Sequence, residues 1–272
     1  MTPEPVVRTV APSTLDATAL AERKGGVTIS VCLPARNEAA TVGTVVETIV
    51  EVCEALVDEV LVLDDGSTDD TASVASSAGA TVVSVDDVLP ELPRGAGKGN
   101  VLWKSLAVAK GDLLVWCDAD LEAFTADYVT RLVAPLLEDD RLQFVKADYH
   151  RPEGDGRTTQ LVARPLLARF FPPLASVRQP LAGECAARAD LLEQLPFVES
   201  YGVEVGLLID VLAAAGLEAM AQVDLGAKEH RHRPLAELSV QAGEVIDVIL
   251  QRAGVAGHHP VRERPPMRTV TR

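Results

Sequence analysis

Apolar runs and helical patterns alternate along the first half of the chain. Short runs rich in Val, Leu and Ile predict strands, and segments with apolar residues at every third or fourth position predict helices between them. The predicted strands cover residues 27–34, 58–67 (running into a loop), 80–87 and 111–118, and the predicted helices cover residues 37–56, 69–79 and 99–110. This alternation predicts βαβ units, and therefore a Rossmann-like α/β fold with a mostly parallel sheet and helices on both faces.

The second half of the chain alternates less regularly. Helical patterns cover residues 125–139, 158–171, 202–216 and 235–254, and extended patterns cover residues 142–150 and 218–226. We expect Pro165 to kink or break its helix, because proline lacks the amide hydrogen and its ring clashes with the preceding turn. The pattern indicates one α/β domain over residues 27–253, which ends with its last helix. The departures from regular strand–helix alternation lie in its second half.

The two ends of the chain show no clear period. Residues 1–26 predict a flexible arm with one short helix near residues 14–23. The tail over residues 254–272 is rich in proline and arginine, which predicts disorder.

Composition and charge narrow the class of function. The 272 residues carry a formal net charge of −15, which argues against binding to nucleic acid or to anionic membranes. No apolar stretch approaches the ~20 residues that a membrane-spanning helix needs. The lack of a signal-peptide pattern and of paired cysteine spacings predicts a soluble, cytoplasmic protein. An acidic protein that binds anionic substrates has to gather its few cations, or a metal ion, at one place.

Polar residues follow three of the predicted strands, in segments 34–38, 64–68 and 118–120. Ligands of open parallel sheets bind beyond the carboxyl ends of the strands. Each segment alone could be a turn or a helix cap, and Asn37 is a good capping residue. Together the three segments predict a polar pocket at one edge of the sheet.

Asp118 and Asp120 stand where a buried strand ends. Two carboxylates separated by one residue at a turn can converge on one divalent cation. Mg²⁺ and Mn²⁺ prefer such oxygen ligands and usually share them with substrate phosphates. The pair therefore predicts a Mg²⁺ or Mn²⁺ site that holds a phosphorylated substrate.

Lys98 opens a predicted helix within the glycine-rich segment 93–100. Backbone amides at a helix start, together with a lysine, suit a phosphate group. The alternative is a flexible loop with a solvated lysine. A Walker A loop is excluded because it needs Ser or Thr after the lysine, where Gly99 stands.

Further candidates lie in the second half of the chain. Residues 228–233 are dense in cations, and His230 among them could complete the metal's ligands or lie at the surface. Arg157 lies in a glycine turn before a helix and suits an anionic group. Glu204 is either a helix-start carboxylate, which the helix dipole favours, or an acid aimed at the site.

Taken together, eight blocks of the sequence resemble the pattern of retaining GT-A glycosyltransferases of the glucosyl-3-phosphoglycerate synthase type (glycosyltransferase family 81 type). The resemblance runs from about residue 27 to residue 253. DDGSTDD and DxD are widespread among GT-A enzymes, whereas the GKG lysine and the later blocks are more particular to this family. The blocks are PARNEAATVG, VLDDGSTDDT, GKGNVLWKSL, DADL, RTTQLVARPLL, QPLAGE, YGVEVGLLID and EHRHRPL.

The resemblance implies an NDP-glucose donor (UDP- or GDP-glucose), a divalent metal and 3-phosphoglycerate as the small anionic acceptor, with residues 27–122 holding the nucleotide sugar and residues 123–253 the acceptor. It also implies a homodimer. The residues that it implies for the nucleotide sugar are Pro34, Ala35, Asn37, Glu38, Asp64, Asp65, Lys98, Asp118 and Ala119. Those that it implies for the metal are Asp118, Asp120 and His230, and those for the acceptor are Gly156, Arg157, Thr159 and His232. The implied catalytic residues are Asp120, Glu204, Lys98 and Arg233, with Glu204 near the transferred sugar and Arg233 facing the diphosphate.

Four residues depart from the family pattern: Arg36, Asp65, Lys228 and His232. Lys228 replaces an arginine and so loses the planar fork that grips a phosphate in two places. His232 replaces an asparagine of the acceptor site, which leaves a different phosphorylated or carboxylated acceptor open.

Other functions also stay open. These are a related glycosyltransferase with another sugar or acceptor, a sugar-phosphate nucleotidyltransferase and a non-catalytic nucleotide-sugar-binding protein. For a retaining transfer, the sequence offers Glu204 as the candidate nucleophile, and front-face attack is the preferred mechanism.

Overall fold

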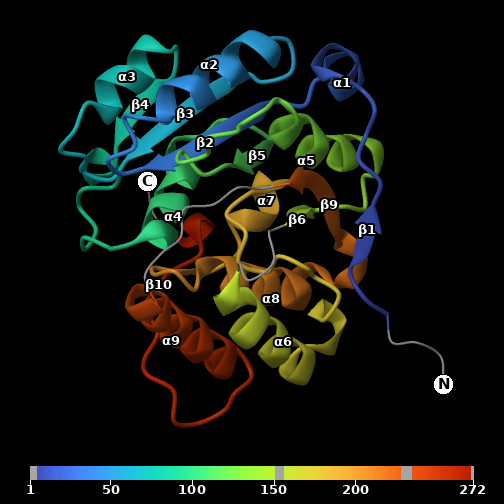
Figure 1. Cartoon of the computed structure of the whole chain (residues 1–272), viewed down its shortest axis with the longest axis vertical. Helices are drawn as coiled ribbons and strands as arrows, with labels where there is room; N and C mark the ends of the chain where they lie inside the picture. The colour runs from blue at the N-terminus through green and yellow to red at the C-terminus, as the bar shows by residue number, and fades with distance from the viewer. Residues whose placement is uncertain (1–4, 151–155, 228–234, 271–272) are drawn as a thin grey trace.

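An eight-stranded sheet forms the centre of the molecule in the computed structural model, which describes residues 5–150, 156–227 and 235–270 (Figure 1). The strands lie in the order β1-β9-β6-β7-β5-β2-β3-β4, and β8 pairs with β10 in a separate ribbon. All pairs in the large sheet are parallel except those that β7 makes with β5 and β6. The strands are β1 Arg8–Val10, β2 Ile29–Ala35, β3 Glu59–Asp64, β4 Thr81–Ser84, β5 Leu113–Trp116, β6 Phe144–His150, β7 Cys185–Arg188, β8 Phe197–Val198, β9 Met220–Ala227 and β10 Glu263–Arg264. This confirms the predicted mostly parallel sheet.

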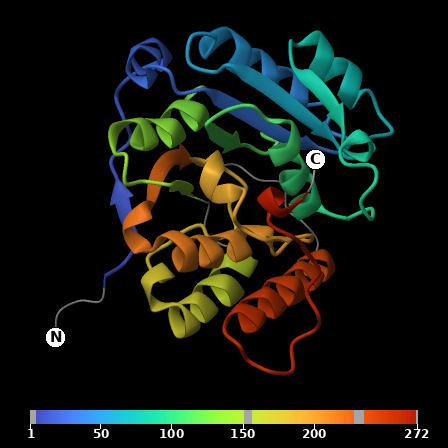
Figure 2. The same cartoon turned by 180° about the vertical axis from the view of Figure 1, so that it is seen from behind.

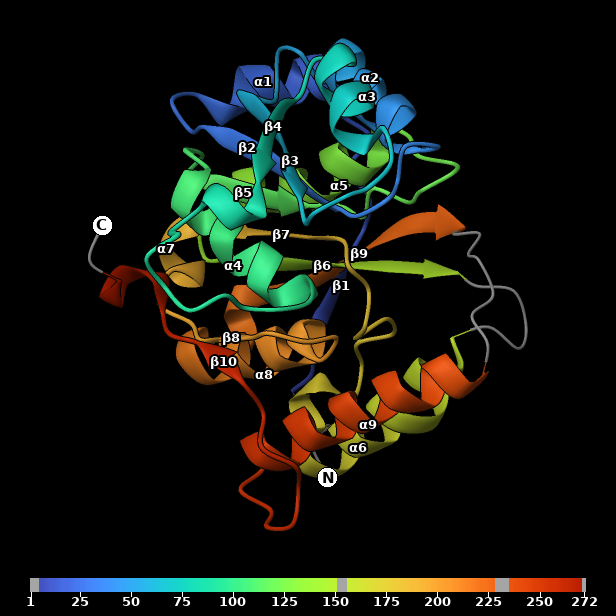
Figure 3. The ribbon, with the colours of Figure 1, turned by 90° about the vertical axis from the view of Figure 1, so that its left-hand side faces the viewer.

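Helices cover both faces of the sheet, as Figure 3 shows edge-on. One layer packs its apolar residues against one face and contains α1 Ala17–Lys24, α2 Val42–Val52, α3 Thr71–Ser77 and α5 Asp127–Glu138. The other layer contains α4 Lys98–Val108, α6 Arg164–Phe170, α7 Ala189–Leu192, α8 Val203–Ala215 and α9 Leu235–Arg252. Single turns complete the structure: η1 Val85–Asp87, η3 Pro172–Leu174, η4 Leu217–Ala219 and η5 Met267–Thr269, with a π-helical segment η2 Thr159–Ala163.

The predicted elements of residues 27–118 are all confirmed, with shorter ends. In the second half the predicted elements are also confirmed, but Pro165 does not break its helix. It lies in the first turn of α6, directly after the π-helical segment η2. The helical run is continuous from residue 157 to residue 170, so the missing proline amide falls inside it, directly after the π-helical turn that interrupts the regular α-helical hydrogen bonds. The sequence analysis missed β7, α7 and β8, which are two to four residues long.

The N-terminal segment is not a loose arm in its described part. The short helix is present as α1, and β1 adds an edge strand in parallel to β9, with Arg8 opposite Ala221 (Figure 2). Val7 is buried beside it. A strand of three residues is too short to show a periodic pattern, and β1 is stabilised by pairing with β9. Composition alone therefore predicted a flexible arm at this position, which is wrong.

The prediction of a disordered tail is wrong for residues 254–270. The tail contains β10, which pairs with β8, and the single turn η5. Arg264 and Met267 are both buried. Proline and arginine suggested disorder, but here the arginine is buried among hydrogen-bond partners that lie more than 160 residues away in sequence.

The described part of the chain holds no helix that is both long and apolar enough to cross a membrane. The four cysteines are free thiols and are buried. Burial raises the pKa of the Cys53 and Cys185 thiols to about 11, so these side chains are neutral.

Candidate active site

A pocket of about 520 Å³ opens at the carboxyl ends of the central strands. The register places these ends side by side, because β2 pairs with β3 up to Ala35 and Asp64 and with β5 up to Cys32 and Trp116. The opposite wall comes from residues 156–159, from the start of α8 and from α9. The pocket therefore lies between the two halves of the sequence. The polar residues after the strands form its first wall, as the sequence predicted.

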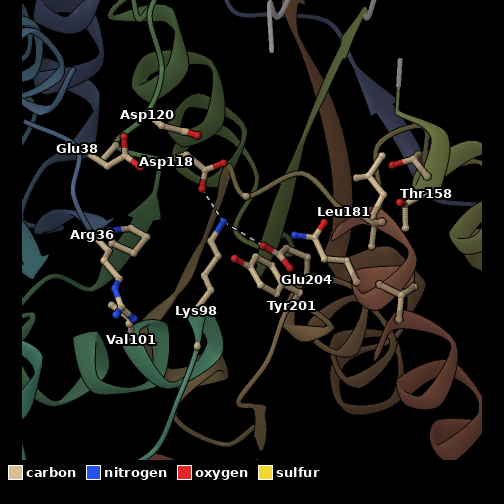
Figure 4. Close-up of a pocket in the computed structure, with 18 of the residues that line it drawn as sticks. Arg36, Glu38, Lys98, Val101, Asp118, Asp120, Thr158, Leu181, Tyr201 and Glu204 are labelled. Carbon is tan, nitrogen blue, oxygen red and sulfur yellow. Dashed lines mark hydrogen bonds and ion pairs between the residues drawn. The ribbon is translucent and has the colours of Figure 1, made fainter. Parts of the chain in front are cut away.

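Lys98 is at the centre of this pocket (Figure 4). Its Nζ lies 2.5 Å from Oδ1 of Asp118 and 3.0 Å from Oε1 of Glu204. Burial lowers the pKa of Lys98, but the carboxylates of Asp118 and Glu204 raise it, and the net result is well above the usual value. The lysine is therefore charged at neutral pH, and it links an acid from the first half of the chain to one from the second.

Two glycines let Lys98 reach this position. Gly97 precedes α4 with φ of +73°, a conformation that side-chain-bearing residues rarely adopt. A Cβ on Gly99 would collide with the carbonyl oxygen of Val198. The GKG block thus places the first turn of α4 directly against β8 and points the lysine into the pocket.

Asp118 and Asp120 both line the pocket directly after β5. The neighbouring Gly183 backbone approaches so closely that a Cβ there would collide with Asp118 and Lys98. Among the described residues, no group of three His, Cys, Asp or Glu side chains is arranged to hold a metal ion. The pair supplies two carboxylates of the type that Mg²⁺ and Mn²⁺ prefer, and so these residues fit such an ion.

The charges along the described pocket wall also favour a bound cation. Five carboxylates line it, but only three cationic side chains. The carboxylates are those of Glu38, Asp65, Asp118, Asp120 and Glu204, and the cations are Arg36, Lys98 and Arg157. A substrate that carries phosphates would meet an excess of negative charge here unless a metal ion neutralised part of it.

Most of the predicted nucleotide residues line the pocket, namely Pro34, Ala35, Glu38, Asp65 and Ala119. Asp65 also lies 3.8 Å from the Arg36 guanidinium. Burial raises the pKa of the Asp65 carboxyl, and Arg36 opposes that rise.

Asn37 and Asp64 are not among the lining residues, and they shape the loops beside the pocket. Asn37 has φ of +59°, and its Oδ1 accepts hydrogen bonds from the amide and hydroxyl of Thr68. The Asp64 Oδ1 accepts the amide of Ser67. Their predicted contact with the nucleotide stays a prediction.

On the opposite wall, the pocket includes Gly156, Arg157 and Thr159, the residues that the resemblance implies for the acceptor. Glu204 is in the first turn of α8 and is buried. Both sequence interpretations therefore hold for Glu204, since it is a helix-start carboxylate and it also faces the site. His230, His232, Arg233 and Lys228 lie outside the described residues.

The sequence analysis did not single out several residues of the wall. Tyr201, Leu181 and Gly183 lie within quoted blocks of the family pattern, which was a usable signal, and Figure 4 shows Tyr201 and Leu181 near Glu204. Tyr149 at the end of β6 and the α9 residues Leu238, Gln241 and Val245 gave no such signal.

The class of the protein follows from a comparison with known families. The model of Glycosyl transferase family 2 matches residues 30–187, which is more than half of the chain and includes most of β2, Lys98 and the aspartate pair. The chain is therefore a glycosyltransferase with the GT-A fold. This match does not test the family 81 type, which stays a prediction.

Individual relatives narrow the class further. The chain is 49% identical over 244 residues to glucosyl-3-phosphoglycerate synthase of Mycolicibacterium paratuberculosis, covering 85% of this chain and 74% of the relative. It is 43% identical over 245 residues to the synthase of Petrotoga mobilis, covering 85% and 75%. A crystal structure of the Mycobacterium tuberculosis synthase superposes with a TM-score of 0.91 at 45% identity, covering 97% of this chain and 99% of that one. The chain belongs to the glucosyl-3-phosphoglycerate synthase family.

Proposed function

We propose that this chain transfers glucose from UDP-glucose to 3-phosphoglycerate, with Mg²⁺ or Mn²⁺ bound and with retention at the anomeric carbon. The observation that carries the proposal is the position of Lys98, which joins Asp118 of the aspartate pair to Glu204 inside one pocket. The similar M. tuberculosis structure was solved with Mn²⁺, UDP-glucose and phosphoglyceric acid. A second structure of that enzyme contains Mn²⁺, UDP and glucosyl-3-phosphoglycerate.

The first wall of the pocket suits the donor. The strand ends with Pro34, Ala35, Glu38, Asp65 and Ala119 would hold the nucleoside, assisted by Asn37 and Asp64 through the loops that they shape. Asp118 and Asp120 would hold the metal, with His230 as a third ligand. Uridine is the expected base because the similar structures contain UDP.

Transfer of the sugar leaves negative charge on the diphosphate. The Lys98 ammonium is partly buried, charged and fixed by two carboxylates before the substrate binds, so little rearrangement is needed when that charge develops. A metal ion held by Asp118 and Asp120 would supply further positive charge to offset the charge of the leaving diphosphate. Arg233 is expected to add a third cation on the diphosphate.

The second wall suits the acceptor. Arg157 offers a guanidinium, which matches phosphate and carboxylate geometry, beside Gly156 and Thr159. His232 is expected to complete the acceptor site.

Retention is expected to follow front-face attack. The buried Glu204 carboxylate is ion-paired with Lys98, which weakens it as a nucleophile and fits a role in positioning the lysine and the sugar. The acceptor's proton would then pass to an oxygen of the leaving diphosphate.

The test is a matrix of substrates with nucleotide release as the readout. The protein is incubated with Mn²⁺ or Mg²⁺, with UDP- or GDP-glucose and with 3-phosphoglycerate or related phosphorylated acids, and the product's anomeric configuration is determined by NMR. UDP release that requires both 3-phosphoglycerate and the metal supports the proposal. UDP release only with a different acceptor would refute 3-phosphoglycerate as the acceptor. Formation of pyrophosphate from UTP and glucose 1-phosphate, without such release, would indicate a nucleotidyltransferase.

We also propose that the protein is a cytoplasmic homodimer. Sedimentation velocity tests the assembly, and fractionation of cells tests the location. A single species with the mass of one chain at micromolar concentration would refute the dimer.

A further inference from the structure

The C-terminal strap, defined as residues 262–267, lies against the glycine-rich turn that carries Lys98. Its strand β10 pairs with β8, and the Glu199 amide donates to the carbonyl oxygen of residue 262 at 3.0 Å. The indole of Trp103 on α4 donates to the Pro265 carbonyl oxygen at 2.7 Å. The buried Met267 ends the strap. These contacts join the chain end to the same helix that begins with Lys98.

Arg264 is the strap residue that reaches the turn. Its side chain is 6% exposed, its Nη2 donates to the Pro93 carbonyl oxygen at 2.7 Å, and its Nε donates to Asn100 Oδ1 at 3.0 Å. The same guanidinium pairs with Glu199 at 3.0 Å and lies 5.1 Å from the centre of the Trp103 ring. One planar fork thus holds both ends of the segment 93–100.

The backbone of the turn packs directly against the Arg264 guanidinium. A Cβ on Gly95 would collide with Arg264 and with the Asn100 side chain. On the other side, the backbone N–H of Asn100 donates to the carbonyl oxygens of Gly97 and Glu199, at 3.1 and 3.4 Å. The backbone from which Lys98 projects is therefore enclosed between the strap and β8.

We propose that Arg264 is a positioning residue for sugar transfer, acting through the glycine-rich turn to hold the Lys98 ammonium between Asp118 and Glu204. This rests on the proposed function. A lysine at position 264 would keep the charge beside Glu199 but would lose the planar fork that holds Pro93 and Asn100 together. Movement of the turn would then misplace an ammonium that has to be fixed before charge develops on the leaving diphosphate.

The test compares Arg264→Lys with wild type by UDP release, with Met267→Ala as the control. Met267 is buried in the same strap, but its thioether has no donor for the Pro93 carbonyl oxygen or for Asn100 Oδ1, so its substitution reports the effect of a weakened strap. For Arg264→Lys we expect kcat to fall about 10-fold while KM for 3-phosphoglycerate changes less than about 2-fold. Met267→Ala should lose at least as much thermal stability and keep kcat within about 2-fold of wild type.

A double-mutant cycle with Lys98→Met separates positioning from general destabilisation. If Arg264 acts through Lys98, Arg264→Lys adds less than about 2-fold to the loss in a Lys98→Met background. The inference is overturned if the kcat losses of the two single variants multiply in the double variant. It is also overturned if Arg264→Lys keeps the wild-type kcat, or if Met267→Ala loses as much kcat as Arg264→Lys. Should Arg264→Lys not fold, Asn100→Ala removes the same contact from the turn and takes its place in the cycle. An inactive wild-type protein would refute the proposed function itself.

Discussion

Replacement of Lys98 by methionine tests the centre of the proposed mechanism. The change removes an ammonium that lies 2.5 Å from Asp118 and 3.0 Å from Glu204, and it leaves two carboxylates facing each other. Methionine has nearly the same length, so the packing around Gly183 is kept.

Two magnitudes follow from this geometry. Loss of one group that stabilises developing charge costs about 100- to 1,000-fold in kcat. Removal of one partner from a buried ion pair costs about 3–5 kcal/mol. The side chains of Lys98 and Asp118 are 19% and 23% exposed, so solvent screens part of this and about 2–3 kcal/mol is expected. That corresponds to a fall in the melting temperature of roughly 5–10 °C.

The matched control is Lys104→Met on the same helix. Lys104 is 4% exposed and donates to the Val85 carbonyl oxygen at 2.6 Å, and it does not line the pocket. We expect this variant to lose stability but to keep kcat within about 2-fold. UDP release with saturating substrates and Mn²⁺, together with thermal denaturation, measures both effects. The reasoning fails if Lys98→Met keeps more than a third of wild-type kcat. It also fails if the kcat of Lys104→Met falls as far as that of Lys98→Met.

Three further substitutions test the site and the fold. Gly183→Ala places a Cβ against Asp118, and we expect kcat to fall at least about 10-fold in the UDP-release assay, with normal activity contradicting the close approach. Glu204→Gln should keep measurable turnover, since a loss of about 10⁴-fold or more would instead indicate a nucleophile. The Asp112 carboxylate accepts the amide and hydroxyl of Thr28, and these bonds hold its pKa below 3.8. Because the folded pKa is depressed, this stabilisation is present above pH 3.8 and is lost as the pH falls through the folded pKa. Asp112→Asn should therefore be less stable than wild type in urea at pH 6, and the difference should shrink towards pH 3; a constant difference would contradict the assignment.

The sequence predicted the first wall of the pocket because that wall depends on local features. Parallel strands of similar length end at one edge of a sheet, so the polar residues that follow β2, β3 and β5 had to lie together. The glycines around Lys98 likewise mark a close approach of the backbone. The pattern also resembled a family, and the comparisons confirm that resemblance.

The remaining features depend on contacts between distant segments. Nothing in the sequence spacing of Lys98 and Glu204 indicates that their side chains meet at 3.0 Å. Likewise β1 and β10 are too short to show a period, and each is stabilised by the strand beside it. Asn37 and Asp64 have the residue types of ligands, but in the structure they hold loops, a use that residue type alone does not separate from binding.

The antiparallel strand β7 has a consequence for how substrates enter and leave. It pairs with β5 on one side, from Leu113 opposite Arg188 to Trp116 opposite Cys185, and with β6 on the other. A continuous hydrogen-bonded ladder therefore joins strand β5 of residues 27–122 to strands β7 and β6 of residues 123–253. A clamshell motion of the two halves would break that ladder, so we expect ligands to enter and leave by local rearrangement at the rim of the pocket.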